Sequence, residues 1–181
     1  NIWVDKATLR TQRFESDIKE DDYTFRSRYD YDWKARRVHT WSQRRQDTPR
    51  EKSMTLTDAS MDAVSLYFNL RSVDLASFRE NEKRTLDMVL EDTIRHLRYH
   101  YIGREEVKVP RLGKFDTMKF ACTIGSSEEY SFTDGSQFFI WITNDENKIP
   151  VMLASPVRIG EVRCYLHKYK GLHYPLVSQI K

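Results

Sequence analysis

Two histidines, His96 and His100, come closest in type and spacing to a chemical site. On a helix, residues four apart share one face, and two imidazoles at this spacing can hold a zinc ion. The pair lacks the glutamate of the HExxH motif, and no third ligand follows it, since His167 and His173 lie in unrelated sequence patterns. On a strand the two side chains would be about 13 Å apart, too far for one metal ion. The secondary structure here therefore decides whether a metal site exists.

The segment that carries these histidines, residues 84–103, fits a helix and a pair of strands equally well. Its helical stripe has spacings of three and four residues: Leu86, Leu90, Ile94, Leu97 and Tyr101. In the strand interpretation, alternate residues share a face on either side of a turn at Glu91-Asp92. The pattern alone leaves both interpretations open.

Other catalytic arrangements have little support. The acidic pairs Glu105-Glu106 and Glu128-Glu129 are sequence neighbours, so on strands their carboxylates face opposite ways and cannot form one acid/base site. The chain contains no GxSxG motif, no HExxH motif and no phosphate-binding loop. We therefore expect a protein that is not an enzyme, with no catalytic residue, no metal site and no cofactor.

The two cysteines, Cys122 and Cys164, belong to no CxxC motif. Both lie among apolar neighbours, where a buried free thiol is commoner than a disulfide. We expect buried free thiols, with one disulfide as the alternative.

The clearest periodicity lies in residues 23–33. One parity carries aromatic residues: Tyr23, Phe25, Tyr29, Tyr31 and Trp33. The other parity carries polar ones: Thr24, Arg26, Arg28, Asp30 and Asp32. Because successive strand side chains point to opposite faces, this pattern predicts an amphipathic strand with an aromatic face. Residues 9–19 predict a preceding strand that ends at the turn 20–22, and residues 37–43 predict the next strand, after a turn at 34–36.

This aromatic face supplies the candidate ligand-binding residues, which are Phe25, Tyr29, Tyr31 and Trp33. An open or partial barrel can hold an apolar or amphipathic ligand when its inner face is aromatic and incompletely filled. Packing in a protein core is the competing explanation for the same stripe.

One helix is predicted at about residues 58–70, after a polar loop at residues 43–52. Thr57 has the side chain of a helix N-cap, and Leu56 and Met61 have the spacing of a hydrophobic staple. The apolar stripe of this helix, which includes Val64 and Phe68, is wide enough to pack against a sheet.

Short apolar runs alternate with turn signals in the C-terminal third of the chain. Strands are predicted at residues 114–124, 149–157 and 160–171. Within residues 131–142, two strand-like runs lie on either side of a predicted hairpin turn at Asp134-Gly135. The predicted fold class is mainly β: a curved antiparallel sheet, or a partial or closed β-barrel, with one packed α-helix. We expect a single domain over residues 1–181.

Composition restricts the partners. Thirty basic and 27 acidic residues leave a formal net charge of +3 without a basic block, which does not indicate nucleic acid. No run of about 18 apolar residues predicts a membrane-spanning helix.

Aromatic residues do alternate with arginines at Arg26, Arg28, Arg36, Arg37, Arg44 and Arg45. A surface that binds polysaccharide or nucleic acid is therefore an alternative, although Asp30, Asp32 and Asp47 dilute its charge.

Residues 99–120 and 132–172 resemble a family of exported bacterial proteins classed as a domain of unknown function, number three-one-zero-eight, typical of Gram-negative envelopes. The motifs that carry the resemblance are Gly103, Glu105 to Val109, Leu112 to Phe115, Trp141 to Pro150 and Tyr169 to Leu172. Weaker similarity extends back through the predicted helix and the Tyr-rich strands.

The resemblance implies β structure for residues 84–102, and with it a hairpin in place of the metal-binding helix. It brings no catalytic residues. It also implies export to the periplasm or the outer membrane, further strands before Asn1, and membrane association only through an anchor outside residues 1–181. We expect an uncharacterised, non-enzymatic envelope scaffold whose partner is a lipid or another apolar or amphipathic ligand; an unrecognised hydrolase is a further alternative.

Overall fold

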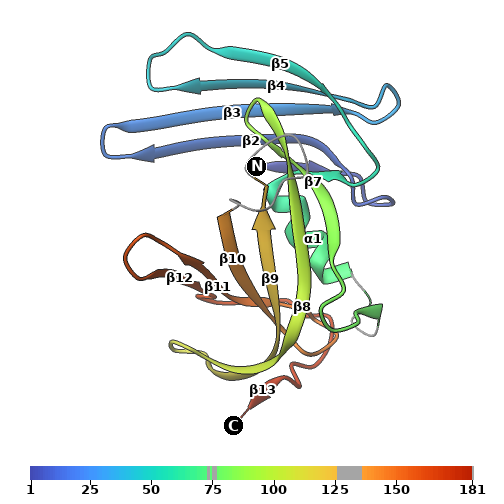
Figure 1. Ribbon diagram of the computed structural model, residues 1–181, viewed down its shortest axis with the longest axis vertical. Helices are drawn as coiled ribbons and strands as arrows, with labels where there is room; N and C mark the ends of the chain where they lie inside the picture. Colours follow the sequence, from blue (N-terminus) through green and yellow to red (C-terminus); the bar gives the residue numbers. More distant parts are fainter. Residues whose placement is uncertain (73, 75–76, 126–135, 181) are drawn as a thin grey trace. The chain divides into compact units, whose positions relative to one another are not determined.

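The computed structural model describes residues 1–72, 74, 77–125 and 136–180, and their fold is mainly β with one helix (Figure 1). The elements are β1 (Ile2–Val4), β2 (Thr11–Glu20), β3 (Tyr23–Asp32), β4 (Arg37–Arg44), β5 (Arg50–Thr55), β6 (Ser60–Met61), α1 (Ala63–Ser72), β7 (Arg84–Leu90), β8 (Thr93–Val109), β9 (Gly113–Ile124), β10 (Ser136–Thr143), β11 (Pro150–Pro156), β12 (Glu161–Tyr165) and β13 (Gln179–Ile180). The predicted fold class is confirmed. Within the described residues both sheets are open, so no barrel closes.

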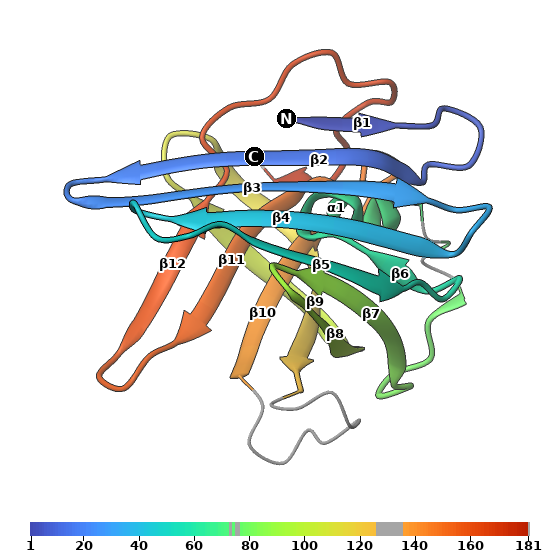
Figure 2. The ribbon, with the colours of Figure 1, turned by 90° about the horizontal axis from the view of Figure 1, so that it is seen from above.

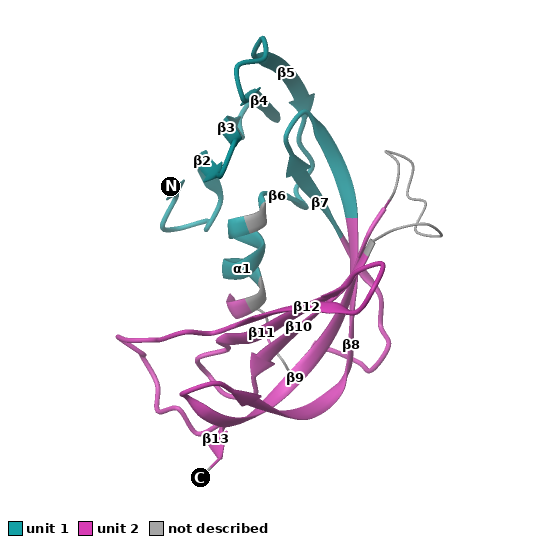
Figure 3. Cartoon of the chain, turned by 90° about the vertical axis from the view of Figure 1, so that its left-hand side faces the viewer, with its two compact units in different colours: residues 1–69, 86–96, 127–129 teal, residues 70–85, 97–126, 130–181 magenta. Residues whose placement is uncertain are grey.

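Two compact units make up the described chain (Figure 3). The first contains residues 1–69 and 86–96, and the second contains residues 70–72, 74, 77–85, 97–125 and 136–180. Each unit has its own cluster of buried apolar side chains. The single domain expected from the sequence remains a prediction.

The first sheet has the strand order β1-β2-β3-β4-β5, and all of its pairs are antiparallel (Figure 2). Its turns lie where the sequence predicted them, with Asp21 and Arg36 at positive φ in the turns on either side of β3. Phe25, Tyr29 and Tyr31 are buried. The predicted amphipathic strand is confirmed, because the aromatic parity of β3 forms part of the core.

The loop predicted at residues 43–52 is shorter than expected. Strand β4 extends to Arg44, and Arg50 opens strand β5, which pairs with β4 through Ser42 and Arg50. Most side chains of β5 are exposed, so the strand shows no apolar alternation. A polar strand at the end of a sheet is held mainly by backbone hydrogen bonds, which its side-chain pattern does not reveal.

Helix α1 begins at Ala63 rather than near residue 58, and its cap is Asp62 rather than Thr57. The Asp62 carboxylate accepts hydrogen bonds from the backbone N–H groups of Val64 and Ser65, at 2.8 and 3.0 Å. The Ser65 hydroxyl accepts from the Asp62 N–H at 3.0 Å, which completes a reciprocal capping arrangement. Asp62 is fully buried and also accepts from the Thr11 hydroxyl, so the cap is tied to strand β2.

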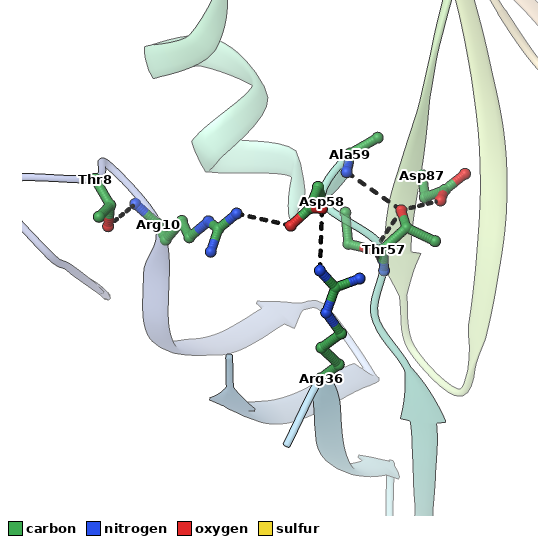
Figure 4. A network of polar contacts seen from close by, with 8 residues as sticks. Thr8, Arg10, Arg36, Thr57, Asp58, Ala59 and Asp87 are labelled. Carbon is green, nitrogen blue, oxygen red and sulfur yellow. Dashed lines mark hydrogen bonds and ion pairs between the residues drawn. The ribbon is translucent and has the colours of Figure 1, made fainter. Parts of the chain in front are cut away.

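Tertiary partners occupy the residues that the sequence assigned to the first helical turn. Asp58 accepts from Arg10 at 3.0 Å and from Arg36 at 3.2 Å (Figure 4). The Thr57 hydroxyl donates to Asp87 at 2.5 Å. The predicted hydrophobic staple is also wrong, because Met61 lies in strand β6, before the helix begins.

The second sheet has the order β12-β11-β10-β9-β8-β7-β6, with β13 added on β9. Strand β9 pairs antiparallel with β8, β10 and β13, and β11 pairs antiparallel with β10 and β12. Strands β6 and β7 run parallel, so the sheet is mixed. The hairpin predicted for residues 84–102 is confirmed, with Glu91 and Asp92 between β7 and β8. Strand β8 continues to Val109, past a register shift between Tyr101 and Gly103, and φ of Gly103 is +152°.

The core of the second unit contains these buried residues: Val107, Val109, Phe115, Trp141, Val151, Met152 and Ala154. The strand predicted at residues 149–157 is confirmed as β11, which begins at Pro150. The predicted hairpin turn at Asp134-Gly135 and the acidic pair Glu128-Glu129 lie outside the described residues. No helix in the described part of the chain is both long enough and apolar enough to cross a membrane.

Both cysteines are free thiols. Cys122 is buried in β9 as expected, and burial raises the pKa of its thiol to about 12. Cys164 is exposed, so its expected burial is wrong. It lies in β12, where the apolar alternation that suggested a buried face occurs on a strand whose residues are all exposed.

Candidate functional site

A row of serines crosses the inner face of the first sheet. Cross-strand register aligns Ser16, Ser27 and Ser42 on β2, β3 and β4. Larger side chains form the two rows beside it, Phe14-Tyr29-Thr40 on one side and Ile18-Phe25-Arg44 on the other. Residues paired across antiparallel strands share a face, so the small serine side chains leave a hollow between two higher walls.

This hollow is a groove of about 500 Å³, within the usual range for ligand sites, and we call it the serine groove. All of its lining belongs to the first unit. The lining residues are Phe14, Ser16, Ile18, Phe25, Ser27, Tyr29, Leu90, Glu91, Asp92, Thr93 and Arg95. The floor comes from β2 and β3, and the opposite side comes from the end of β7, the turn after it and the start of β8.

Two hydroxyl groups in the groove differ in their hydrogen bonding. The Tyr29 hydroxyl accepts from the backbone N–H of Glu91 at 2.7 Å, and burial raises the pKa of this phenol, which therefore stays neutral. The Ser27 hydroxyl is buried and lies near the Tyr29 hydroxyl, whose pKa it lowers, but no hydrogen bond of normal length joins it to any described residue. Buried hydroxyls normally have a partner, so Ser27 can bond a polar atom brought by a ligand.

Charges of both signs border the groove. The Nη2 atom of Arg44 lies 3.6 Å from Oε1 of Glu91, and Nη1 of Arg50 lies 4.0 Å from Oδ2 of Asp92. The Arg44 guanidinium is 5.9 Å from the centre of the Phe25 ring. A second hollow of about 170 Å³ shares Phe25 and Glu91 with the groove and is bordered by both arginines. An apolar floor with a charged border suits an amphipathic molecule better than a purely apolar one.

Only half of the aromatic stripe predicted to bind a ligand lines the groove. Phe25 and Tyr29 do, and Tyr31 and Trp33 do not. Tyr31 is a core residue that stacks on Trp33 with 5.8 Å between ring centres. The Trp33 indole N–H donates to the backbone oxygen of Thr11 at 2.7 Å. The structure thus gives Tyr31 and Trp33 packing contacts, and ligand binding by Phe25 and Tyr29 remains a prediction.

Sequence reasoning missed the serines and the second wall. A usable signal was present, because residues 14–18 read F-x-S-x-I and residues 25–29 read F-x-S-x-Y. In both strands a small residue lies between two large apolar ones of the same parity. No local sequence pattern indicates that Leu90 and the turn after it also line the groove, because they come from a distant part of the chain.

The two histidines form no metal pair, because both lie on the extended strand β8. His96 is buried, and its Nδ1 lies 2.7 Å from a carboxylate oxygen of Asp87, whose other oxygen accepts from Thr57 at 2.5 Å. The pair orients the imidazole, which borders a cavity of about 230 Å³ together with Lys52, Met54 and Ile94. Among the described residues, no group of three or more His, Cys, Asp or Glu side chains could hold a metal ion.

The Asp87 and His96 pair is the arrangement that orients a general base. No serine, threonine or cysteine lines the described cavity beside it. The links from Thr57 through Asp87 to His96 join the chain before β6 to strands β7 and β8, so they serve as a polar tie inside the first unit.

Comparison with known proteins gives a family and no nearer relative. The family model described as "Protein of unknown function (DUF3108)" matches residues 1–167 of the 181 in the chain. No curated protein and no solved structure matches. The resemblance drawn from the C-terminal motifs is confirmed, and the match extends over the N-terminal sheet as well. The chain therefore belongs to DUF3108, a family of proteins of unknown function.

Proposed function

We propose that this protein is a non-enzymatic binding protein that holds an amphipathic ligand in the serine groove. The observation that carries the proposal is the buried hydroxyl of Ser27, which makes no hydrogen bond of normal length to a described residue and lies on the floor of a groove of about 500 Å³. The groove needs no metal or cofactor to act in this way. The pairing of β2 with β3 keeps the lining residues of these two strands in a fixed register.

The contacts suggest how such a ligand would lie. Its apolar part would lie along Phe14, Ile18 and Phe25, where burial of apolar surface favours binding by about 25 cal/mol for each Å². A hydroxyl, carbonyl or amide of the ligand would reach Ser27. Its polar end would lie at the border near Arg44 and Glu91, where either sign of charge finds a partner.

A substitution that fills the groove tests this proposal. Ser27→Phe places a ring between the two walls, and Ser53→Phe is the matched control on an exposed position of β5 in the same sheet. The amphipathic dye 1-anilinonaphthalene-8-sulfonate is titrated into each protein, with oleate and lysophosphatidylcholine as competitors. We expect saturable, competed binding for the parent and the control, and at least tenfold weaker binding for Ser27→Phe.

Equal binding by Ser27→Phe and the parent, with both folded by circular dichroism, would overturn the serine groove as the site. Native mass spectrometry after mild purification is the complementary measurement. If the parent retains no bound molecule and binds none of the probes, the ligand-binding function is wrong.

We also propose that the protein is exported and acts in the periplasm or at the outer membrane of a Gram-negative bacterium. Membership of DUF3108 supports this proposal, through the resemblance to exported proteins. Fractionation of the source cells, with detection by a specific antibody, tests it. Recovery with cytoplasmic markers would refute export and would leave the ligand proposal in place.

A polysaccharide-binding outer face is a second candidate function, favoured by one row of residues. Register aligns Glu15, Arg28, Trp41 and Glu51 across β2 to β5. They border a hollow of about 670 Å³ whose arginines are paired with carboxylates, as Arg28 is with Asp30 at 3.2 Å. Such pairing disfavours nucleic acid and leaves the Trp41 ring as a stacking surface. Loss of oligosaccharide binding in Trp41→Ala would support it.

The proposal that the protein is not an enzyme has its own test at His96. An ester hydrolase that used the Asp87 and His96 pair would cleave p-nitrophenyl esters of short acids and would lose this activity in His96→Gln. We expect no turnover above the buffer rate for either protein. Turnover by the parent that His96→Gln abolishes would refute the proposal.

A further inference from the structure

Strand β12 is the last strand of the second sheet, and its outer edge pairs with no strand among the described residues. Its residues, Glu161–Tyr165, are all exposed. Unpaired strands at a sheet edge can pair with another chain unless something covers or interrupts them. The inner edge of β12 is paired with β11 along its whole length.

The register shows which backbone groups face the open edge. The N–H of Leu166 donates to the oxygen of Val151, and the N–H of Val157 donates to that of Gly160, at 2.9 and 3.1 Å. In an antiparallel ladder, hydrogen-bonded residue pairs alternate with non-bonded ones. Val162 and Cys164 are therefore bonded to β11, and three residues direct N–H and C=O groups outward: Glu161, Arg163 and Tyr165.

One face of this edge is apolar. A row of paired residues runs across β9 to β12: Phe120, Ile140, Leu153 and Cys164. Exposure along the row rises from 0% at Phe120 and 6% at Ile140 to 39% at Leu153. Val162 is 52% exposed on the same face of β12 as Cys164. The apolar surface therefore continues to the open edge without a cover in the described part of the chain.

We propose that β12 pairs antiparallel with β12 of a second copy of this chain, about a two-fold axis at Val162. In this register Glu161 lies opposite Arg163 of the second copy, and the reciprocal pair is identical. Both residues direct their backbone groups to the edge, so each opposite pair also exchanges hydrogen bonds. Glu161 and Arg163 already form an ion pair within β12, and this register adds the same pairing across the edge. An axis at Arg163 would instead place two guanidinium groups opposite each other.

The pairing also joins the apolar faces of the two copies. Val162 lies opposite Val162 of the second copy as a non-hydrogen-bonded pair, in which side chains are closest. Cys164 lies opposite Gly160 of the second copy, which has no Cβ and leaves room for the thiol. The two Cys164 residues are then about 13 Å apart along the strands and form no disulfide.

Charge exchange and cross-linking test the register together. Sedimentation equilibrium of the whole chain should show a dimer. Glu161→Arg should raise its dissociation constant at least tenfold, and the double variant Glu161→Arg, Arg163→Glu should restore the parent value. Under mild oxidation, Val162→Cys combined with Cys164→Ser should give a covalent dimer, and the parent should not.

Each result has a clear consequence. A parent chain that remains monomeric at 100 µM overturns the proposal, and so does a dimer that Glu161→Arg leaves unchanged. Covalent dimers through native Cys164, without any through Val162→Cys, would overturn the register. Because every substituted side chain is exposed, circular dichroism should show the parent spectrum for each variant.

Discussion

Removal of the Tyr31 hydroxyl should stabilise the first sheet, although the residue lies in its core. This oxygen is buried and has no hydrogen-bond partner in the described part of the chain, and burial raises the pKa of the phenol far above its ordinary value. An unsatisfied buried polar group costs about 1–3 kcal/mol. Tyr31→Phe keeps the ring that stacks on Trp33 and removes only the unsatisfied group. We expect the free energy of unfolding to increase by about 1 kcal/mol.

Tyr29→Phe is the matched control, because it also removes one buried phenol hydroxyl from β3. The difference is that the Tyr29 hydroxyl has a hydrogen-bond partner. The Tyr29 hydroxyl accepts from the backbone N–H of Glu91 at 2.7 Å. Its removal leaves that N–H unsatisfied, so stability should fall by about 1 kcal/mol. The two variants should therefore change stability in opposite directions.

Urea unfolding followed by tryptophan fluorescence measures both changes. With a slope of about 2 kcal/mol/M, each variant moves the midpoint by about 0.5 M, upward for Tyr31→Phe and downward for Tyr29→Phe. An unchanged slope shows that stability itself changed. A loss for Tyr31→Phe as large as that for Tyr29→Phe would show that the Tyr31 hydroxyl has a partner, and the reasoning would be wrong.

Three further predictions follow from single residues. Ellman's reagent should modify Cys164 in the folded protein and Cys122 only after unfolding, because Cys122 is buried and its thiol pKa is raised to about 12; equal rates would contradict this. Asp62→Ala should lower the free energy of unfolding by about 2 kcal/mol, because it removes a buried helix cap, while Asp58→Ala at an exposed ion pair should change it by less than about 0.5 kcal/mol. Desolvation lowers the pKa of His100 in the folded state, so the unfolded chain binds protons more readily. The stability that neutral His100 contributes is therefore complete above the ordinary histidine pKa, and it is lost as the pH falls from that value toward the lower pKa of the folded state. Between pH 7.5 and pH 5, the melting temperature should therefore fall more steeply for the parent than for His100→Gln.

Local patterns predicted the strands wherever one face was buried and the other was polar. Strand β3 was predicted in this way from its alternating aromatic residues, and charged residues at Asp21 and Arg36 marked the turns on either side of it. The same reasoning missed β5, because its side chains are exposed on both faces. It also misplaced the start of α1, because Thr57 and Asp62 are both suitable caps and only their partners distinguish them.

The sequence by itself determined that the chain alternates with a period of two, that its histidines lie on a strand once the family resemblance is included, and that residues 23–33 present an aromatic face. Only the tertiary structure decided that Ser16, Ser27 and Ser42 align across the sheet, that Ser16 and Ser27 line a groove, and that Asp87 meets His96. The reason is strand register. The alternation within a strand determines which face of the sheet a side chain lies on, but its neighbours across the sheet depend on pairing with distant segments. A register shift of one residue would replace every one of those neighbours.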